Sequence, residues 1–232
     1  MTDNTPVKQS PIHTQALKMG ARFMDGAGWQ MPSQFSTQES EETAARSRVA
    51  LADVSNRGKI YLEGKTAATI LSLLDSQAVP GIGQGIQQND RTIFRLRADQ
   101  FFISTTAEEV ESVAAELTAT AQKSAELITV TDMTHGRSQL WVVGPQAAEL
   151  LSRLCSLDFH DHHFPNLTAR HSSVAKTRQL ILRHDFGRPA PLPVYGLIGS
   201  RSLAAYLWET TLEAGRDLDI IPIGQITLDR LK

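Results

Sequence analysis

The sequence is poor in cysteine and has no long apolar run, and each shortage excludes a class of protein. Its 232 residues include one cysteine, Cys155, so no disulfide can form within the chain. A single thiol suits a reducing compartment, and we expect a cytoplasmic location. No stretch approaches the ~20 consecutive apolar residues of a membrane span, and residues 1–10 are too polar for a signal peptide.

An excess of one charge sign is also missing. The 23 Lys and Arg residues nearly balance the 25 Asp and Glu residues, and the net charge is −2. The basic residues are spread along the sequence, so we expect neither a nucleic acid nor a membrane as the main ligand. A hydrophobic content of 41% is enough for one large domain or two small ones.

The patterns that are present alternate between helix and strand. Helix signals cover residues 37–50, 65–74, 107–121, 146–155 and 202–214. Strand signals cover residues 59–63, 91–96, 100–105, 127–131, 138–143, 174–177, 179–184 and 193–198. Ser36 or Thr37 can cap the first helix, Thr106 can cap the third, and Gly215 ends the last. Residues 1–11 show no periodicity, and we expect a flexible tail there.

A repeat divides the sequence into two halves. Residues 60–76 read IYLEGKTAATILSLLDS, residues 140–156 read LWVVGPQAAELLSRLCS, and seven of the seventeen positions are identical at an offset of 80. Both copies open a strand–helix–strand–strand–helix order, which is the split βαβ pattern. We therefore expect an α+β fold with two related halves, residues 12–132 and 133–232, and antiparallel sheets in a ferredoxin-like or Greek-key order. The alternative is that any strand–glycine–helix unit would match as well.

Short motifs that often carry chemistry are weak in this sequence. The segment PGIGQG at residues 80–85 lacks the Lys-Ser/Thr of a phosphate-binding loop and precedes a strand, so a connector is the simpler interpretation. The segment DFHDHH at residues 158–163 offers five metal-ligating side chains, but no second cluster accompanies it, and we expect an exposed loop without a metal. Cys155 shares the apolar helix face of Leu151 and Leu154, and we expect it in the core.

Four aspartates stand at strand ends or turns by this assignment: Asp53, Asp90, Asp132 and Asp185. Aspartate at such positions normally caps an element or shapes a turn. Carboxylates at strand ends can equally line a ligand cleft between two sheets, and both interpretations stay open here. Thr134-His135-Gly136 has no G-x-S-x-G elbow around it, which disfavours a hydrolase.

Several segments together resemble one known family. They are GARFMD at residues 20–25, GWQMP at 28–32, ADVS at 52–55, and a helix with Glu41 or Glu42, Ala45 and Arg48. This order resembles the start of the aminomethyltransferase, or glycine cleavage T-protein, family. The second half, with Gly144-Pro145, CSLD at 155–158, Phe164-Pro165, Arg170 and YLW at 206–208, also resembles the gamma subunit of heterotetrameric sarcosine oxidase. The resemblance covers residues 11 to about 230.

The resemblance implies the T-protein folate-binding fold, with tetrahydrofolate held between the two halves. In the family, an aspartate of a D-D-[LI]-[IV] segment orients or activates the folate amine. This chain has Asn89-Asp90 at that place, and an asparagine cannot accept a proton at neutral pH, although Asp90 can substitute if the strand register shifts. The histidine of the family's D-V-S-H is Asn56 here.

Two further parts of the family pattern are altered. The Y-T-G-E-x-G-[YF]-E motif is absent, and His184, Asp185 and Tyr195 lie in that region. Arg230 keeps an echo of the family's G-x-G-A-R-D segment, and the family's small C-terminal barrel is not represented. The resemblance therefore implies a set of folate-binding residues that consists of Asn56, Asn89, Asp90, His184, Asp185, Tyr195 and Arg230, with no metal.

Two functions remain open on these residues. The first is a tetrahydrofolate-binding, aminomethyltransferase-like protein of glycine or sarcosine metabolism, with reduced catalysis. The second is a non-catalytic subunit of the gamma type, which acts through a partner chain such as a lipoyl carrier or a flavoprotein subunit. A folate-dependent accessory protein of iron–sulfur cluster maintenance is disfavoured, because its K-G-C-Y-x-G-Q motif does not occur.

The Asn89 substitution yields a prediction. Asn89→Asp restores the proton-accepting group of the family and should raise any methylene-transfer activity, by about 10²-fold if the carboxylate acts in the transition state. Transfer to tetrahydrofolate is the measurement. An unchanged rate would mean that position 89 does not face the ligand.

Overall fold

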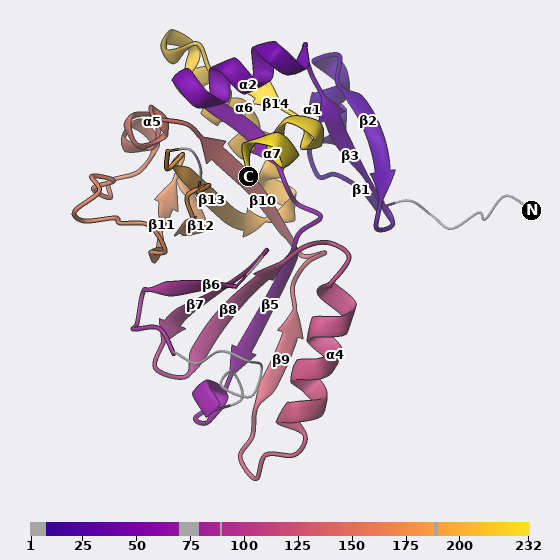
Figure 1. Cartoon of the computed structure of the whole chain (residues 1–232), viewed down its shortest axis with the longest axis vertical. Coiled ribbons are helices and arrows are strands. Elements are labelled where there is room, and N and C mark those ends of the chain that lie inside the picture. The colour runs from indigo at the N-terminus through magenta and orange to yellow at the C-terminus, as the bar shows by residue number, and fades with distance from the viewer. Residues whose placement is uncertain (1–7, 70–78, 89, 188–189) are drawn as a thin grey trace, which may run out of the picture. The chain divides into compact units, whose positions relative to one another are not determined.

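The structure is a computed structural model that describes residues 8–69, 79–88, 90–187 and 190–232. The chain forms two compact units (Figure 1). Unit 1 comprises Met1–Asn56, Ser138–Asn166 and His171–Lys232, and unit 2 comprises Arg57–Arg137 and Leu167–Arg170. Among the described helices, none is both long and apolar enough to cross a membrane.

Unit 2 is built on a five-stranded antiparallel sheet in the order β6–β7–β8–β5–β9. Its strands are β5 (Gly58–Glu63), β6 (Gly85–Gln88), β7 (Arg91–Arg97), β8 (Gln100–Thr105) and β9 (Thr129–Asp132). Helix α4 (Val110–Ala121) packs Val113 and Leu117 against Ile60, Leu62 and Ile103 of the sheet. The predicted hairpin is confirmed, because β7 and β8 pair antiparallel and only Ala98 and Asp99 connect them. Two residues are enough to join antiparallel neighbours.

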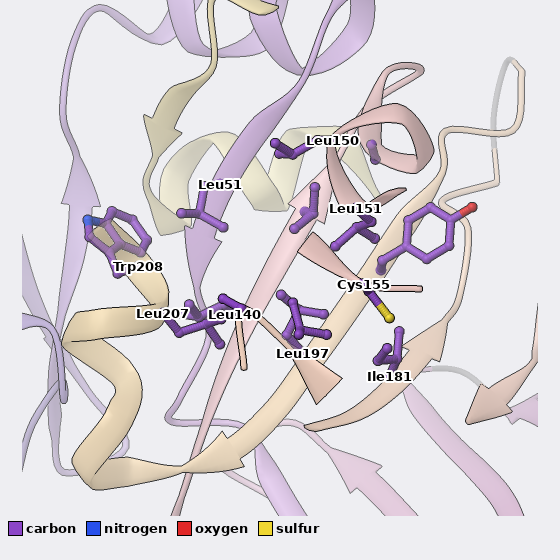
Figure 2. Close-up of a cluster of buried hydrophobic side chains, with 14 of the residues drawn as sticks. Leu51, Leu140, Leu150, Leu151, Cys155, Ile181, Leu197, Leu207 and Trp208 are labelled. Atoms are coloured by element: carbon purple, nitrogen blue, oxygen red, sulfur yellow. The ribbon is translucent and has the colours of Figure 1, made fainter. Parts of the chain in front are cut away.

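Unit 1 holds a six-stranded sheet in the order β11–β12–β13–β10–β4–β14. Its strands are β4 (Ala50–Asp53), β10 (Arg137–Val143), β11 (Ala169–Val174), β12 (Thr177–Arg183), β13 (Val194–Ser200) and β14 (Ile221–Ile223). Leucine and isoleucine side chains from β4, β10, β12 and β13 meet Leu150 and Leu151 of α5 (Ala147–Leu154) and Leu207 and Trp208 of α6 (Ala204–Ala214) in one core (Figure 2). Burial of such side chains is the main stabilising contribution of this unit.

The N-terminal segment adds a small sheet to unit 1. Strand β3 (Trp29–Gln34) pairs in parallel with β1 (Lys8–Gln9) and antiparallel with β2 (Arg22–Gly26), and α1 (His13–Lys18) lies between β1 and β2 in sequence. Ser10 is buried and donates a hydrogen bond to Asp53. The expected tail is therefore ordered from residue 8 onward, because its backbone pairs with β3, and residues 1–7 lie outside the described part.

Helix α2 (Gln38–Ser47) is tied to the C-terminal segment by one buried carboxylate. Thr37 caps the helix, as predicted, by accepting from the Ser40 N–H at 3.3 Å. Glu41 is fully buried and accepts from the N–H groups of Phe35 (2.6 Å) and Ser36 (2.9 Å) through Oε1. Its Oε2 accepts from the Gly224 N–H (3.0 Å) and the Thr227 hydroxyl (2.6 Å), which fixes the start of α7 (Gln225–Leu231).

The sequence repeat corresponds to the same local structure in both units. Gly64 and Gly144 follow β5 and β10, which we call the central strands because each has a neighbouring strand on both edges and opens one copy of the repeat. The two glycines have φ angles of 148° and 124°. A Cβ at either glycine would meet a backbone carbonyl oxygen, that of Leu127 at 2.7 Å or that of Arg48 at 2.5 Å. The Gly64 N–H donates to the Asp99 carbonyl and the Gly144 N–H to the Pro193 carbonyl, both at 2.9 Å, and each acceptor directly precedes a strand, β8 or β13. Helical residues begin three positions after each glycine, at Ala67 and at Ala147. Only glycine suits these two positions.

A second shared feature stands at the start of each central strand. In unit 1, the Gln139 N–H donates to Ser55 Oγ (3.0 Å) and the Val54 N–H donates to the Gln139 carbonyl (3.0 Å). In unit 2, the Lys59 N–H donates to Thr134 Oγ1 (3.1 Å) and the Met133 N–H donates to the Lys59 carbonyl (2.8 Å). We call these two D-x-S/T turns, Asp53–Ser55 and Asp132–Thr134, the strand clasps.

The compact units divide the chain differently from the two contiguous halves expected from the repeat. Strand β4 precedes β5 in the sequence but pairs with β10, and β9 precedes β10 but pairs with β5. Strand β10 therefore takes one neighbour, β4, from the first half of the sequence, whereas both neighbours of β5 lie in its own half. The two sheets share the order of their first four strands, since β5, β8 and β7 occupy the places of β10, β13 and β12. The α+β fold with two repeated split βαβ motifs is confirmed.

Some predicted elements are corrected. The strand expected at 174–177 is a turn between β11 and β12, where Ala175 and Lys176 have φ angles of 48° and 62°. Thr106 does not cap α4, because the helix begins only at Val110 after a turn. The helix expected at 65–74 is described only for residues 67–69, and its remainder lies outside the described residues. Helix α6 ends at Gly215 as predicted, and the 3-10 turns Arg201–Leu203 and Arg216–Leu218 flank it.

The Glu41 contacts generate a stability prediction. Glu41→Gln replaces one accepting oxygen by an NH2 group that faces donors, and it should lower the free energy of unfolding by about 2 kcal/mol. Glu42→Gln is the matched control, because Glu42 only pairs with Arg46 at 3.1 Å on the helix surface and should change stability by less than about 0.5 kcal/mol. Urea unfolding measures both, and equal effects would contradict the assignment.

Candidate functional site

The residues of the predicted folate site are distributed over both units. Unit 1 contains Asn56, His184, Asp185, Tyr195 and Arg230, unit 2 contains Asp90, and Asn89 lies outside the described residues. Asp90 is exposed, and its carbonyl accepts from Arg57 Nη2 at 2.8 Å. Arg230 is exposed on α7, and its carbonyl accepts from Arg46 at 3.3 Å. Of the remaining candidates, His184 and Asp185 directly follow β12, and Tyr195 lies on the neighbouring strand β13.

Asp185 is engaged by a buried arginine. Arg183 Nε and Nη2 donate to Asp185 Oδ1 (2.9 Å) and Oδ2 (3.0 Å), and Nη1 donates to Asp161 Oδ1 (2.6 Å) and the Phe164 carbonyl (2.7 Å). The Arg183 and Asp185 side chains are only 6% and 7% exposed. Burial alone would lower the pKa of Arg183, but the hydrogen bonds to Asp185 and Asp161 outweigh it and raise that pKa. Asp185 is thus an ion-pair partner rather than an available proton acceptor.

Tyr195 lies in the core of unit 1. Its ring packs at 5.6 Å from that of Phe159 and at 5.9 Å from that of Phe164, and the Arg183 guanidinium lies 5.3 Å from its centroid. Burial raises the pKa of Tyr195 to about 12, against the lowering effect of Arg183. Tyr195 belongs to the same hydrophobic cluster as Leu140 and Leu197, on one face of the six-stranded sheet. Its contacts are those of a core residue that anchors the 158–164 loop.

The opposite face of the sheet carries an aromatic group with His184. The Trp141 ring lies 4.9 Å from that of His184 and 5.6 Å from that of Phe186, both edge to face. Trp141 is buried with Val143, Ala52 and Val194 in a second hydrophobic cluster. The structure therefore separates His184 from Tyr195, although the sequence places them in one motif region, because alternate strand residues point to opposite faces.

Four buried amide oxygens of unit 1 have no hydrogen-bond partner among the described residues: those of Asn56, Gln139, Gln146 and Gln179. Gln139 stands two residues before Trp141, so it shares its face of the sheet, and its side chain is 1% exposed. Among the described residues, nothing donates to Gln139 Oε1 or to the buried Asn56 Oδ1. Buried oxygens of this kind normally have a hydrogen-bond donor. Gln139 was not among the residues predicted from sequence, and its signal was a polar side chain inside the apolar strand RSQLWVV.

The aspartates at the strand clasps shape turns. Asp53 is buried and accepts from the Ser55 N–H (3.0 Å), the Ser55 hydroxyl (2.5 Å) and the Ser10 hydroxyl. Asp132 is exposed and accepts from the Thr134 N–H at 2.8 Å. The turn-shaping interpretation is confirmed for these two residues.

The structure also places the cysteine, the histidine-rich segment and the glycine-rich loop. Cys155 is 7% exposed in the hydrophobic core of unit 1, with Sγ 3.5 Å from the Ser172 hydroxyl (Figure 2). His160, His162 and His163 are exposed, and no group of three or more potential metal ligands occurs within the described ranges. The loop at 80–85 is held by Arg170, whose Nη1 donates to the Gly83 carbonyl at 3.0 Å.

Tyr195 generates a pH-dependent prediction. A tyrosine whose folded pKa exceeds its ordinary value of 10 contributes stability below pH 10 that is lost as the pH rises from 10 to about 12. The free energy of unfolding of the wild type should therefore fall more steeply over this range than that of Tyr195→Phe. Urea unfolding at several pH values measures the difference, with Tyr206→Phe as the half-exposed control. Parallel curves for wild type and Tyr195→Phe would refute the burial of this hydroxyl.

Sequence relatives share one function name. Aminomethyltransferases from Anoxybacillus flavithermus and Geobacillus kaustophilus are 25% and 27% identical to the chain over 238 residues. Each match covers 97% of this chain and 64% of the relative. The chain thus spans just under two thirds of the length of the curated relatives it matches.

Solved structures show the same fold. The glycine cleavage system aminomethyltransferase T from Bartonella henselae superposes with a TM-score of 0.81 at 23% identity, over 97% of this chain and 62% of that one. A chain of the heterotetrameric sarcosine oxidase from Corynebacterium sp. U-96 superposes with a TM-score of 0.67 at 18% identity, over 90% of this chain and 95% of that one. The model of the GCVT N-terminal domain matches residues 12–232, and the chain belongs to this family.

Proposed function

We propose that this chain binds tetrahydrofolate and is an aminomethyltransferase-like protein of cytoplasmic one-carbon metabolism, with glycine or sarcosine as the source of the carbon and with reduced catalysis. Family membership over residues 12–232 and relatives named aminomethyltransferase support the general kind of protein. The observation that carries the ligand is two of the four partnerless buried amide oxygens found among the described residues, Gln139 Oε1 and Asn56 Oδ1.

The chemistry of these residues fits a reduced pterin. A pterin ring has N–H donors and acceptors along its edge and flat faces, so a buried amide oxygen and an aromatic side chain suit it. Gln139 Oε1 would accept from the ring edge, and Asn56 Oδ1 would accept from a second N–H. The Trp141 indole, on the same face as Gln139, would exclude water. When bound, tetrahydrofolate supplies the nucleophilic amine that takes up the one-carbon unit.

Reduced catalysis follows from the state of the acidic residues. To react, the amine of the proposed tetrahydrofolate ligand needs a proton acceptor or an oriented carboxylate beside it. Both oxygens of Asp185 are bound by Arg183, and position 89 is an asparagine, which cannot accept a proton at neutral pH. The chain's own groups therefore support binding better than turnover.

The alternative is a non-catalytic subunit that acts through a partner. It is supported by the shared fold with a chain of heterotetrameric sarcosine oxidase. Under this alternative, a flavoprotein subunit or a lipoyl carrier would supply the one-carbon unit.

Calorimetric titration with tetrahydrofolate under reducing conditions tests the proposal. The wild type should bind in the micromolar range, and Gln139→Leu should weaken binding about tenfold, because the ring edge loses its acceptor. Gln179→Leu is the matched control, because Gln179 is also buried with a partnerless Oε1. It lies on the sheet face of Ile181, opposite to that of Trp141, and its Nε2 donates to Thr177 Oγ1 at 2.9 Å. Absence of wild-type binding would favour the subunit alternative, to be followed by co-purification with a flavoprotein partner.

A further inference from the structure

The chain segment before α1 is attached to unit 1 by a short strand and a few side chains. Strand β1 pairs with β3 over only two residues, Lys8 and Gln9, and Arg201 Nη2 donates to the Gln9 carbonyl at 2.6 Å. Lys8 Nζ and the central guanidinium carbon of Arg201 lie 6.0 Å and 5.6 Å from the centroid of the Trp29 ring. We call residues 8–12 the N-terminal strap. A strand this short, with both residues exposed, opens locally at a low free-energy cost.

The strap inserts one buried serine into unit 1. Ser10 is 4% exposed, and its hydroxyl oxygen accepts from the Ile12 N–H at 3.1 Å. The same hydroxyl donates to Asp53 Oδ2. A hydrogen bond to a buried carboxylate is stronger than one between neutral groups. The bond to Asp53 is therefore a strong attachment for a strap whose strand is short.

Ser55 makes the same pair of bonds on the other oxygen of Asp53. Its hydroxyl donates to Asp53 Oδ1 at 2.5 Å and accepts from the Gln139 N–H at 3.0 Å. The Gln139 carbonyl, 3.4 Å from Ser55 Oγ, competes for the same hydroxyl hydrogen. The carboxylate is the stronger and nearer acceptor, so Asp53 directs that hydrogen and turns the Ser55 oxygen toward the Gln139 N–H. One carboxylate thus joins the strap to the start of β10.

The bonds of Asp53 bear on two groups of the candidate ligand site. Ser55 holds Gln139, and Asn56 follows Ser55 in the chain. Gln139 Oε1 and Asn56 Oδ1 are the oxygens assigned to the ligand above. When the strap opens, Asp53 loses the Ser10 hydroxyl, and its carboxylate can rotate away from Ser55. The position of the strap and the positions of the two ligand groups are therefore coupled.

We propose that Ser10 is a positioning residue for the ligand site and acts through the Asp53 carboxylate. With the strap in place, the site holds its ligand groups in one arrangement. With the strap released, the site loses affinity, so that docking of the strap regulates binding. Coupling of this kind is reciprocal, and a bound ligand also stabilises the docked strap. That Gln139 and Asn56 meet tetrahydrofolate rests on the proposed function, whereas the positioning rests on the hydrogen bonds alone.

Hydrogen exchange of the ligand-free full chain, followed by NMR, tests the positioning directly. Ser10→Ala should speed up exchange of the Gln139 N–H about fivefold or more relative to that of Val142 in the same strand, because the acceptor of the Gln139 N–H is no longer held. Ile181→Val is the control for stability. It trims the core of unit 1 on β12, which β13 separates from β10, and should lower the melting temperature without changing that ratio.

Calorimetric titration with tetrahydrofolate tests the link to the ligand. Ser10→Ala should weaken binding about fivefold or more, and Ile181→Val should leave it unchanged. In an Asp53→Asn background, Ser10→Ala should cause no further weakening, because its effect passes through that carboxylate. Saturating tetrahydrofolate should slow exchange of the Ser10 N–H, which donates to the Gln30 carbonyl at 3.3 Å in the docked strap. This last measurement uses the wild type and holds even if a variant does not fold.

The outcomes separate this inference from the proposed function. If Ser10→Ala lowers only the melting temperature, and the Gln139 exchange ratio and tetrahydrofolate binding stay at their wild-type values, Ser10 is merely structural and the inference is refuted, while the folate proposal stands. Faster Gln139 exchange with unchanged tetrahydrofolate binding also refutes it. If the wild type binds no tetrahydrofolate, the folate proposal fails. Faster Gln139 exchange in Ser10→Ala then still supports positioning by Ser10, and an unchanged ratio overturns it.

Discussion

The rest of the structure depends on the strand clasps, in which a serine or threonine hydroxyl accepts the N–H at the start of each central strand. Ser55 holds Gln139 and Thr134 holds Lys59, and in each case the residue before the hydroxyl bonds the same strand through its own N–H. The clasp fixes the register of the strand, and register decides which side chains face which side of a sheet. The placement of Gln139 with Trp141, and of Lys59 with Ser104, follows from these bonds.

The fold was largely predictable because its signals are local. The glycines at 64 and 144, the alternation in β7 and β8, and the cap at Thr37 all depend on neighbouring residues. What the sequence could not show was pairing between distant segments. The β1–β3 pair, the exchange of β4 and β9, and the preference for Glu41 over Glu42 as the buried carboxylate all rest on tertiary contacts that leave no periodic pattern.

The candidate site was predicted only in part, and for a definite reason. A motif region was located near residues 184–195, but whether a side chain there faces the core depends on a one-residue register. That register sends Tyr195 into the hydrophobic core and leaves His184 against Trp141. From the sequence, Asp185 is open to a turn-shaping or a ligand-binding role, and in the structure Arg183, two residues earlier, binds both of its oxygens. The role of Gln139 could not be predicted, because a single polar residue in an apolar strand belongs to no recognisable motif.

The exchange of β4 and β9 also bears on how fast the protein reaches its native state. Strand β4 cannot be completed on both edges until Leu140–Val143 and Ile221–Ile223 have been brought to it from far along the chain. Such distant pairings must close large loops before any contact compensates, and domains dominated by them fold in roughly milliseconds to seconds rather than microseconds. Until then, the open edge of β10 is a surface that a second nascent chain can pair with. Folding of this protein should therefore depend on concentration more strongly than its balanced surface charge would suggest.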